Sequence, residues 1–141
     1  MTTGQSDPRG VVALTIPAKA DYIVLCRLAL SGLARVRALE PALVADLKLA
    51  LTEACSNSVR HAYDGQRSGK VEVRYELGDD KLSVEVVDAG IGFDPETAAA
   101  DAGDELDEGG LGISIICAIV DELDIKSNGS GSSLRFTKYL A

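Results

Sequence analysis

Apolar residues in the first part of the chain change from an alternating to a helical period. Val12, Leu14 and Ile16 occupy every second position, which predicts a short, half-buried strand ending at Pro17. From about Ala18, apolar residues recur every three or four positions, and this pattern predicts a helix with one face in the core. The residues assigned to that face are Tyr22, Leu25, Cys26, Ala29, Leu30, Leu33 and Val36.

A second helix is predicted from Pro41, because proline is favoured at the first position of a helix. It ends at a turn formed by residues 63–65. Its apolar stripe consists of Leu47, Leu51, Ala54, Cys55 and Ala62. Two long helices are therefore expected before the main sheet.

Alternation returns after the second helix and predicts a β-hairpin. Apolar residues alternate over 71–75 and again over 82–86, with a turn at 78–80 between them. The next segment, 88–110, is rich in glycine, alanine and acidic residues and has no sustained period. An irregular loop of that length inside a compact domain is uncommon and usually functional, so we interpret residues 93–108 as a lid.

The last part of the chain predicts one more helix and a second hairpin. The helix begins near Leu111 and extends to Ile119, and apolar positions at 123–125 and 134–136 flank a turn at 127–131. Strands joined by hairpins argue against a doubly wound parallel fold. We therefore expect an α/β (α+β) two-layer sandwich, with helices packed on one face of a mixed, largely antiparallel sheet.

Composition and charge limit the partners. The 141 residues carry a net charge of −8 and are 46% hydrophobic, which suits a single domain over 11–141 after a polar leader, 1–10. Nucleic-acid phosphates would repel so acidic a surface, so direct binding to nucleic acid is not expected. The sequence has no signal-peptide or membrane-spanning run, which favours the cytoplasm and no membrane partner. Cys26, Cys55 and Cys117 lack metal-ligand spacing and fall in apolar helical stretches, so we expect buried thiols.

Glu53 and Asn57 are the first candidates for chemistry. They lie four positions apart in the second predicted helix and share one stripe beside its apolar face. A carboxylate there can accept a proton, and an amide oxygen one turn away can ligate Mg²⁺. The same spacing occurs on ordinary solvated helix faces, so the pair alone does not identify a site.

A second cluster follows the strand 82–86, where Asp88 precedes Gly90 and Gly92. The Asp88 carboxylate can accept a hydrogen bond from an exocyclic amine such as that of adenine, and the glycines would let the backbone approach a flat base. An ordinary strand-to-loop turn uses the same residue types. The dinucleotide-binding fingerprint is missing, because it needs three glycines opening directly into a helix.

Glycines also open the third predicted helix. Gly110 and Gly112 lie in the stretch Glu108-Gly-Gly-Leu-Gly-Ile113, and backbone N–H groups at a helix N-terminus attract phosphate. No Gly-Lys-Ser/Thr follows, so this is not a P-loop, and a lid hinge is the alternative interpretation. Ser132 opens the last strand, where its hydroxyl could support the adenine that Asp88 holds.

The four motifs in this order resemble the ATPase family shared by gyrase, Hsp90, histidine kinases and MutL, over about 11–139. This resemblance implies the histidine-kinase-like ATPase fold and the binding of Mg-ATP. Several stretches are similar to the anti-sigma serine kinase branch in particular. They are Asp46-Leu-Lys-Leu-Ala50, Glu53-Ala-Cys-Ser-Asn57, His61-Ala-Tyr63, Glu108-Gly-Gly-Leu-Gly112 and Thr137-Lys-Tyr-Leu140.

The resemblance implies a role for each candidate residue. Glu53 would be the general base, Asn57 the Mg²⁺ ligand, and Asp88 the acceptor for the adenine amine. The other positions would line the nucleotide, with Gly90 and Gly92 at the adenine, Gly110 and Gly112 at the phosphates, and Ser132 where the family commonly has threonine. Relatives can carry an arginine where this chain has Glu108, so the source of positive charge at the γ-phosphate stays open, with Arg60 and Arg67 as candidates.

The same branch implies protein partners and a homodimer. The partners are a sigma factor held inactive and a small anti-anti-sigma protein phosphorylated on serine. In these relatives an arginine on the first helix contacts both, and Arg27 matches that position; a solvated surface arginine is the alternative. We therefore interpret the chain as an anti-sigma factor with ATP-dependent serine kinase activity. The alternatives are a non-catalytic, nucleotide-binding module that sequesters a sigma factor, and the catalytic domain of a histidine kinase.

Overall fold

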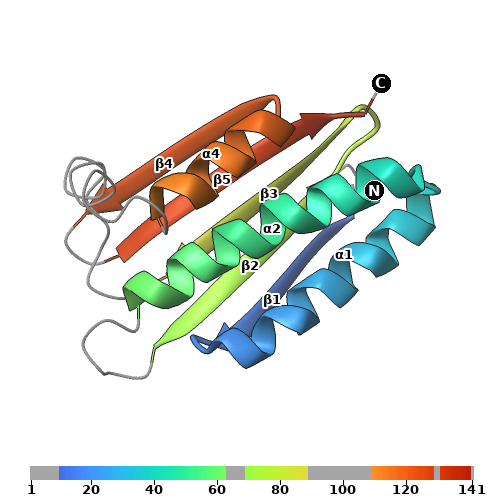
Figure 1. Ribbon diagram of the computed structural model, residues 1–141. Coiled ribbons are helices and arrows are strands. Elements are labelled where there is room, and N and C mark those ends of the chain that lie inside the picture. Colours follow the sequence, from blue (N-terminus) through green and yellow to red (C-terminus); the bar gives the residue numbers. More distant parts are fainter. Residues whose placement is uncertain (1–9, 63–68, 89–108, 129–130, 141) are drawn as a thin grey trace, which may run out of the picture.

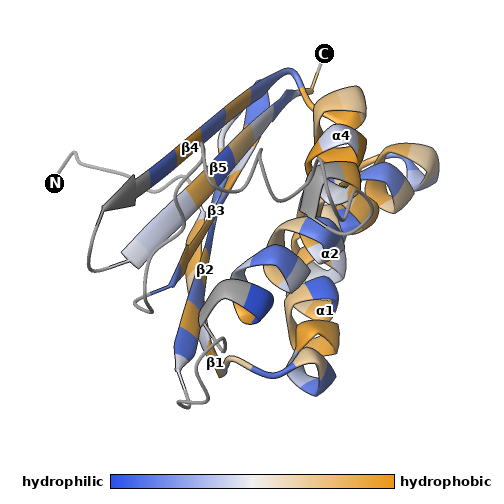
Figure 2. Ribbon diagram, turned by 60° about the vertical axis from the view of Figure 1, so that its left-hand side comes forward, coloured by the Kyte–Doolittle hydropathy of each residue, from blue (hydrophilic) through white to orange (hydrophobic). Residues whose placement is uncertain are grey.

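The computed structural model describes residues 10–62, 69–88, 109–128 and 131–140. These residues form two layers, with a five-stranded sheet on one side and three described α-helices covering one of its faces (Figure 1). Figure 2 shows the opposite face of the sheet without a helical cover. The predicted two-layer α/β (α+β) sandwich is confirmed.

The elements follow one another as the hydrophobic pattern predicts. They are β1 Val11–Pro17, the 3₁₀ helix η1 Ala20–Tyr22, α1 Ile23–Arg37, α2 Pro41–Ala62, β2 Lys70–Leu77, β3 Lys81–Asp88, α4 Gly109–Ile119, β4 Glu122–Asn128 and β5 Gly131–Tyr139. The sheet order is β1-β2-β3-β5-β4. All four neighbouring pairs are antiparallel, so the described sheet contains no parallel pair and is more uniform than the mixed, largely antiparallel sheet expected.

The two faces of the sheet differ because side chains alternate along each strand. The apolar positions predicted in the first hairpin all point toward the helices and are buried; they are Val71, Val73, Tyr75, Leu82, Val84 and Val86. On the open face, Arg74, Glu85, Arg135 and Asp124 are successive neighbours across four strands. This row of alternating charge suits a solvated surface, since opposite charges on adjacent strands attract one another.

The helical layer confirms one predicted core face and corrects another. In α2, Leu47, Leu51, Ala54 and Cys55 are fully buried, as expected. In α1, the buried residues are Ile23, Cys26, Leu30 and Ala34, while the predicted core residues Leu25 and Val36 are exposed, as is Tyr22 at the end of η1. The assignment was wrong because α1 is apolar on two sides, and a helical period alone does not show which side meets the sheet.

The three thiols also differ. Cys26 and Cys55 are buried as predicted, but Cys117 is exposed, because α4 buries its neighbour Ile116 and turns residue 117 toward solvent. A hydrogen bond between the two buried thiols lowers the pKa of Cys26 and raises that of Cys55 well above its ordinary value. Among the described helices, none has the length and apolar character needed to cross a membrane.

Candidate active site

Glu53 and Asn57 lie one turn apart on α2. Asn57 is only 7% exposed and Glu53 is half-buried. Neither side chain forms a hydrogen bond or an ion pair within the described part of the chain. Leaving a buried amide without a partner costs about 1–3 kcal/mol, so such a group indicates a ligand that would satisfy it.

Gly112 brings the first turn of α4 against the Glu53 carboxylate. A Cβ built at Gly112 would lie 3.0 Å from Glu53 Oε1, whereas ordinary contacts begin at 3.4 Å. Only glycine therefore allows this approach without displacing the carboxylate. The first N–H groups of a helix have no partners within it, and in α4 they belong to the turn that starts at Gly109 and includes Gly110. Glu53 thus lies beside a helix N-terminus that favours anions.

Asp88 and Ser132 meet across the sheet. Asp88 ends β3 and is only 2% exposed, and Ser132 faces it in register on β5. The Ser132 hydroxyl donates a hydrogen bond of 2.7 Å to Asp88 Oδ2. This contact fixes the orientation of a buried carboxylate, as a group that recognises one edge of a ligand requires.

These residues come from segments far apart in the sequence but gather at one end of the molecule. Figure 1 shows the end of α2, the end of β3, the start of β5 and the start of α4 at that end. Gly90, Gly92, Arg67 and Glu108, and the predicted lid, lie outside the described residues. Arg60 is exposed on α2.

Arg27 lies apart from the site, between α1 and α2. Its Nη1 donates to Thr52 Oγ1 at 3.5 Å, and the Thr52 hydroxyl donates in turn to the backbone oxygen of Lys48 at 2.8 Å. Arg27 therefore does not reach the α4 side of α2, where Glu53 meets Gly112. The structure brings together Glu53, Asn57 and Gly112, pairs Asp88 with Ser132, and separates Arg27 from both groups.

The residues present fit a magnesium ion that is shared with a nucleotide. No cluster of three or more His, Cys, Asp or Glu occurs among the described residues, so these provide no all-protein metal cage. Mg²⁺ commonly takes one or two protein oxygens and completes its shell with water and substrate phosphates. The unpaired Asn57 amide beside the Glu53 carboxylate meets that smaller requirement.

Comparison with known proteins identifies the family of the chain. Residues 16–138 match the family model of the histidine kinase-like ATPase domain. The serine-protein kinase RsbW of Bacillus velezensis is 39% identical over 137 residues, covering 92% of this chain and 85% of the relative. RsbW of Bacillus subtilis is 36% identical with the same coverage, and RsbW of Listeria innocua is 38% identical over 92% of this chain and 87% of the relative.

Two solved structures show the same fold at low sequence identity. The RsbU and RsbW domains of Rv1364c from Mycobacterium tuberculosis match with a TM-score of 0.69 and 20% identity, over 94% of this chain and 33% of that one. The histidine kinase domain of a blue-light activated kinase from Erythrobacter litoralis matches with a TM-score of 0.58 and 22% identity, over 89% of this chain and 62% of that one. The chain belongs to the histidine kinase-like ATPase family and, within it, to the serine-protein kinases of the RsbW type.

Proposed function

We propose that this chain binds Mg-ATP, transfers the γ-phosphoryl group to a serine of a small anti-anti-sigma protein, and holds a sigma factor inactive in the cytoplasm. The observation that carries the proposal is that Glu53 and Asn57, beside the first turn of α4, have no hydrogen-bond or ion-pair partner among the described residues. Relatives that are 36–39% identical over most of their length are named serine-protein kinases, which favours serine as the acceptor over histidine.

Glu53 acts as the general base in this proposal. Its carboxylate accepts the proton of the substrate serine hydroxyl as that oxygen attacks the γ-phosphorus, and a positioned carboxylate of this kind contributes about 10²- to 10⁴-fold to a rate. Asn57 would hold Mg²⁺ through its amide oxygen. When bound, Mg²⁺ neutralises charge on the phosphates. The first turn of α4 offers backbone N–H groups to the same phosphates.

Asp88 selects the base of the nucleotide. Its carboxylate accepts a hydrogen bond from the exocyclic amine of adenine, while Ser132 holds the other side of the carboxyl group at 2.7 Å. Guanine presents a carbonyl at the equivalent position, and two acceptors would repel one another. The proposal therefore includes a preference for ATP over GTP.

The proposal places the protein partners away from the nucleotide. Arg27 contacts the sigma factor and the anti-anti-sigma protein from α1, and two copies of the chain form a homodimer. Arg27 contacts Thr52 on the α1 side of α2 while Glu53 contacts Gly112 of α4, which is consistent with one surface for recognition and another for chemistry.

The deciding experiment incubates the full chain with labelled ATP, Mg²⁺ and each candidate anti-anti-sigma protein from the same genome. We expect one partner to acquire phosphoserine. Binding of ATP without labelling of any partner would instead show a non-catalytic sequestering module. Acid-labile phosphohistidine on an added partner would show the catalytic domain of a histidine kinase.

A further inference from the structure

Helix α4 carries no charged side chain on any of its sides. Its 11 residues, Gly109–Ile119, include neither an acidic nor a basic residue, and Figure 2 colours most of the helix as hydrophobic. Gly112 and Ile116 are buried, whereas the outer positions Leu111 and Ser114 are exposed, with Leu111 55% accessible. A helix without charges is normally buried on all sides. The uncharged solvent side of α4 therefore indicates a surface that another molecule covers.

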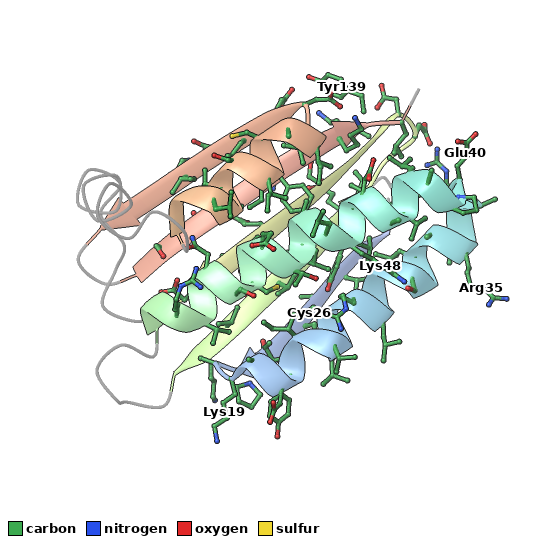
Figure 3. All side chains as sticks on the ribbon, in the orientation of Figure 1. Lys19, Cys26, Arg35, Glu40, Lys48 and Tyr139 are labelled. Carbon is green, nitrogen blue, oxygen red and sulfur yellow. The ribbon has the colours of Figure 1, made fainter. Side chains whose placement is uncertain are left out.

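The exposed side chain of Leu111 belongs to the turn that meets the proposed base. It precedes Gly112, whose backbone packs against the Glu53 carboxylate. On α2, Leu49 lies one turn before Glu53 on the same stripe and is 44% exposed. Lys48 lies on the other side of α2, alongside α1 (Figure 3). Leu49 and Leu111 therefore flank the Glu53 carboxylate from two helices.

The other charges on this side of α2 lie two turns away from Glu53. Asp46 and Arg60 occupy the same stripe, seven positions before and seven positions after it, and both are exposed. Among the described residues, no other charged side chain of α2 lies on this stripe, and α4 adds none. Contact immediately beside Glu53 must therefore depend on burial of apolar side chains rather than on ion pairs.

We propose that Leu49 and Leu111 form a docking surface for the acceptor segment of the protein substrate, and that this segment carries an apolar side chain close to its serine. The serine oxygen must come within about 2.6–3.2 Å of the carboxylate that takes its proton. Residues beside that serine then lie over the side chains that flank Glu53, and the apolar one covers the two leucines. The inference rests on the proposed function, and it names the feature of the substrate that the site recognises.

The nucleotide fits the docking surface less well. Phosphates bind cations and N–H groups, and a leucine side chain offers neither. The adenine ring could use apolar contacts, but Asp88, which holds it in the proposed function, is buried at the end of β3 and belongs to the sheet layer. Leu49 and Leu111 instead face solvent on the helical layer. Their exposure beside Glu53 favours a protein segment that arrives from solvent.

The test measures steady-state phosphoryl transfer from Mg-ATP to the anti-anti-sigma protein that the wild type labels. The full chain is compared with Leu49→Gln, Leu111→Gln, the conservative variant Leu111→Met and the control Val11→Gln, which places glutamine at a 61% exposed apolar position on β1. We expect each glutamine variant of the docking surface to raise the KM for the protein substrate about fivefold or more, because an apolar contact is lost. Leu111→Met and Val11→Gln should keep the wild-type KM, since methionine conserves the apolar volume and Val11 lies outside the docking surface.

Three further measurements separate docking from other effects. The Kd of Mg-ATP should be unchanged in Leu49→Gln, because Leu49 is not among the residues that hold the nucleotide in the proposed function. Thermal unfolding of Leu49→Gln should occur close to the wild-type temperature, since the position is exposed and glutamine favours a helix about as well as leucine does. In the acceptor, replacing the apolar neighbour of the phosphorylated serine by glutamine should raise the KM of the wild type but add little in Leu111→Gln, where the same contact is already lost.

The outcomes separate this inference from the proposed function. A wild-type KM for the protein substrate in both Leu49→Gln and Leu111→Gln would overturn the docking surface and leave the kinase proposal standing. Weaker Mg-ATP binding in Leu49→Gln, with an unchanged KM for the protein substrate, would show that the surface serves the nucleotide, which also overturns the inference. A wild-type chain that binds Mg-ATP but phosphorylates none of the anti-anti-sigma proteins would overturn the proposed function and the docking surface with it.

Discussion

Polar groups on the two sides of helix α2 differ in whether they form hydrogen bonds within the described part of the chain. On the side of α4, the Glu53 carboxylate and the buried Asn57 amide have no partner among the described residues. On the side of α1, the Thr52 hydroxyl of α2 accepts a hydrogen bond from Arg27 and donates one to the backbone oxygen of Lys48, and Tyr75 Oη donates to the backbone oxygen of Cys26. A fold that satisfies its polar groups on one side and leaves them unsatisfied on the other keeps the second side for a ligand.

This difference predicts which property each substitution will change. Glu53 and Asn57 on the α4 side stabilise the fold little, because they form no hydrogen bond or ion pair among the described residues, and their loss should mainly reduce activity. Buried polar groups on the α1 side, such as the Tyr75 hydroxyl, are part of the core, and their loss should mainly reduce the free energy of unfolding. The comparison would fail if a substitution on the α4 side mainly lowered the free energy of unfolding, or if loss of a buried group on the α1 side mainly lowered activity.

The largest effect is expected for Glu53→Gln. This change keeps the size of the side chain and its capacity for hydrogen bonding but removes the base. Phosphoryl transfer to the anti-anti-sigma partner should fall by about 10²- to 10⁴-fold. The measurement is the single-turnover rate with saturating Mg-ATP.

Capture of the sigma factor provides the control for that variant. It should be unchanged, since Glu53 faces α4 and the proposed partner contact, Arg27, lies on α1. The paired variant Arg27→Ala should weaken capture and leave ATP affinity intact. If Glu53→Gln transferred phosphate at the wild-type rate, the general-base role would be wrong.

Asp88→Asn should have the next largest effect, on nucleotide recognition. The carboxylate makes a charge-assisted hydrogen bond to adenine in our proposal, and such bonds contribute about 1.5–3 kcal/mol. The dissociation constants of ATP and GTP, measured by calorimetry, should therefore move toward one another. Wild-type protein that binds GTP as tightly as ATP would remove the case for Asp88 as the selecting group.

A smaller effect is expected for Gly112→Ala, and Gly32→Ala is its matched control. Both changes add one methyl group to a helix, but the Gly112 methyl would lie 3.0 Å from Glu53 Oε1 while the Gly32 methyl meets nothing within 4 Å. Displacing a reacting group by a fraction of an ångström should slow phosphoryl transfer by about tenfold. Gly32→Ala should keep the wild-type rate and raise the free energy of unfolding by up to about 1 kcal/mol. Equal rates for the two variants would show that Glu53 adjusts without loss.

The sequence predicted the strands better than the packing of α1. In a sheet with one covered face, the apolar residues that alternate over 71–75 and 82–86 can all point toward the helices in only one way. Their burial could therefore be predicted from the alternation alone. Helix α1 has apolar residues on two sides with the same spacing, and the pattern merged the exposed Leu25 and Val36 with the buried Cys26 and Leu30. Only tertiary contact with the sheet separates them. Cys117 was assigned to the core for the same reason.

The candidate site was predictable in its parts but not in its contacts. Spacing placed Glu53 and Asn57 on one stripe, and the strand ends placed Asp88 and Ser132 where the sheet pairs them. Gly112 and Glu53 are 59 positions apart in the sequence, so their contact between α4 and α2 could not be predicted from a local pattern. The missing partner of Asn57 is likewise a property of the packed structure, because the sequence does not show which amides are buried.

The smallest effect is expected on the α1 side, for Tyr75→Phe. Loss of the hydroxyl that donates to Cys26 should lower the free energy of unfolding by about 1 kcal/mol at neutral pH, without changing the rate of phosphoryl transfer.

Burial, reinforced by the neighbouring Cys26 and Cys55, raises the pKa of Tyr75 above its ordinary value. The folded state therefore holds this proton more tightly than the unfolded state. Its contribution to stability is complete below the unfolded pKa of about 10 and declines as pH rises toward the folded value. Urea unfolding at pH 8 and pH 11 should thus show a steeper loss of stability in the wild type than in Tyr75→Phe. Parallel losses in the two proteins would mean that Tyr75 is not the group that titrates, and a slower kinase reaction in Tyr75→Phe would mean that the two sides of α2 are not independent.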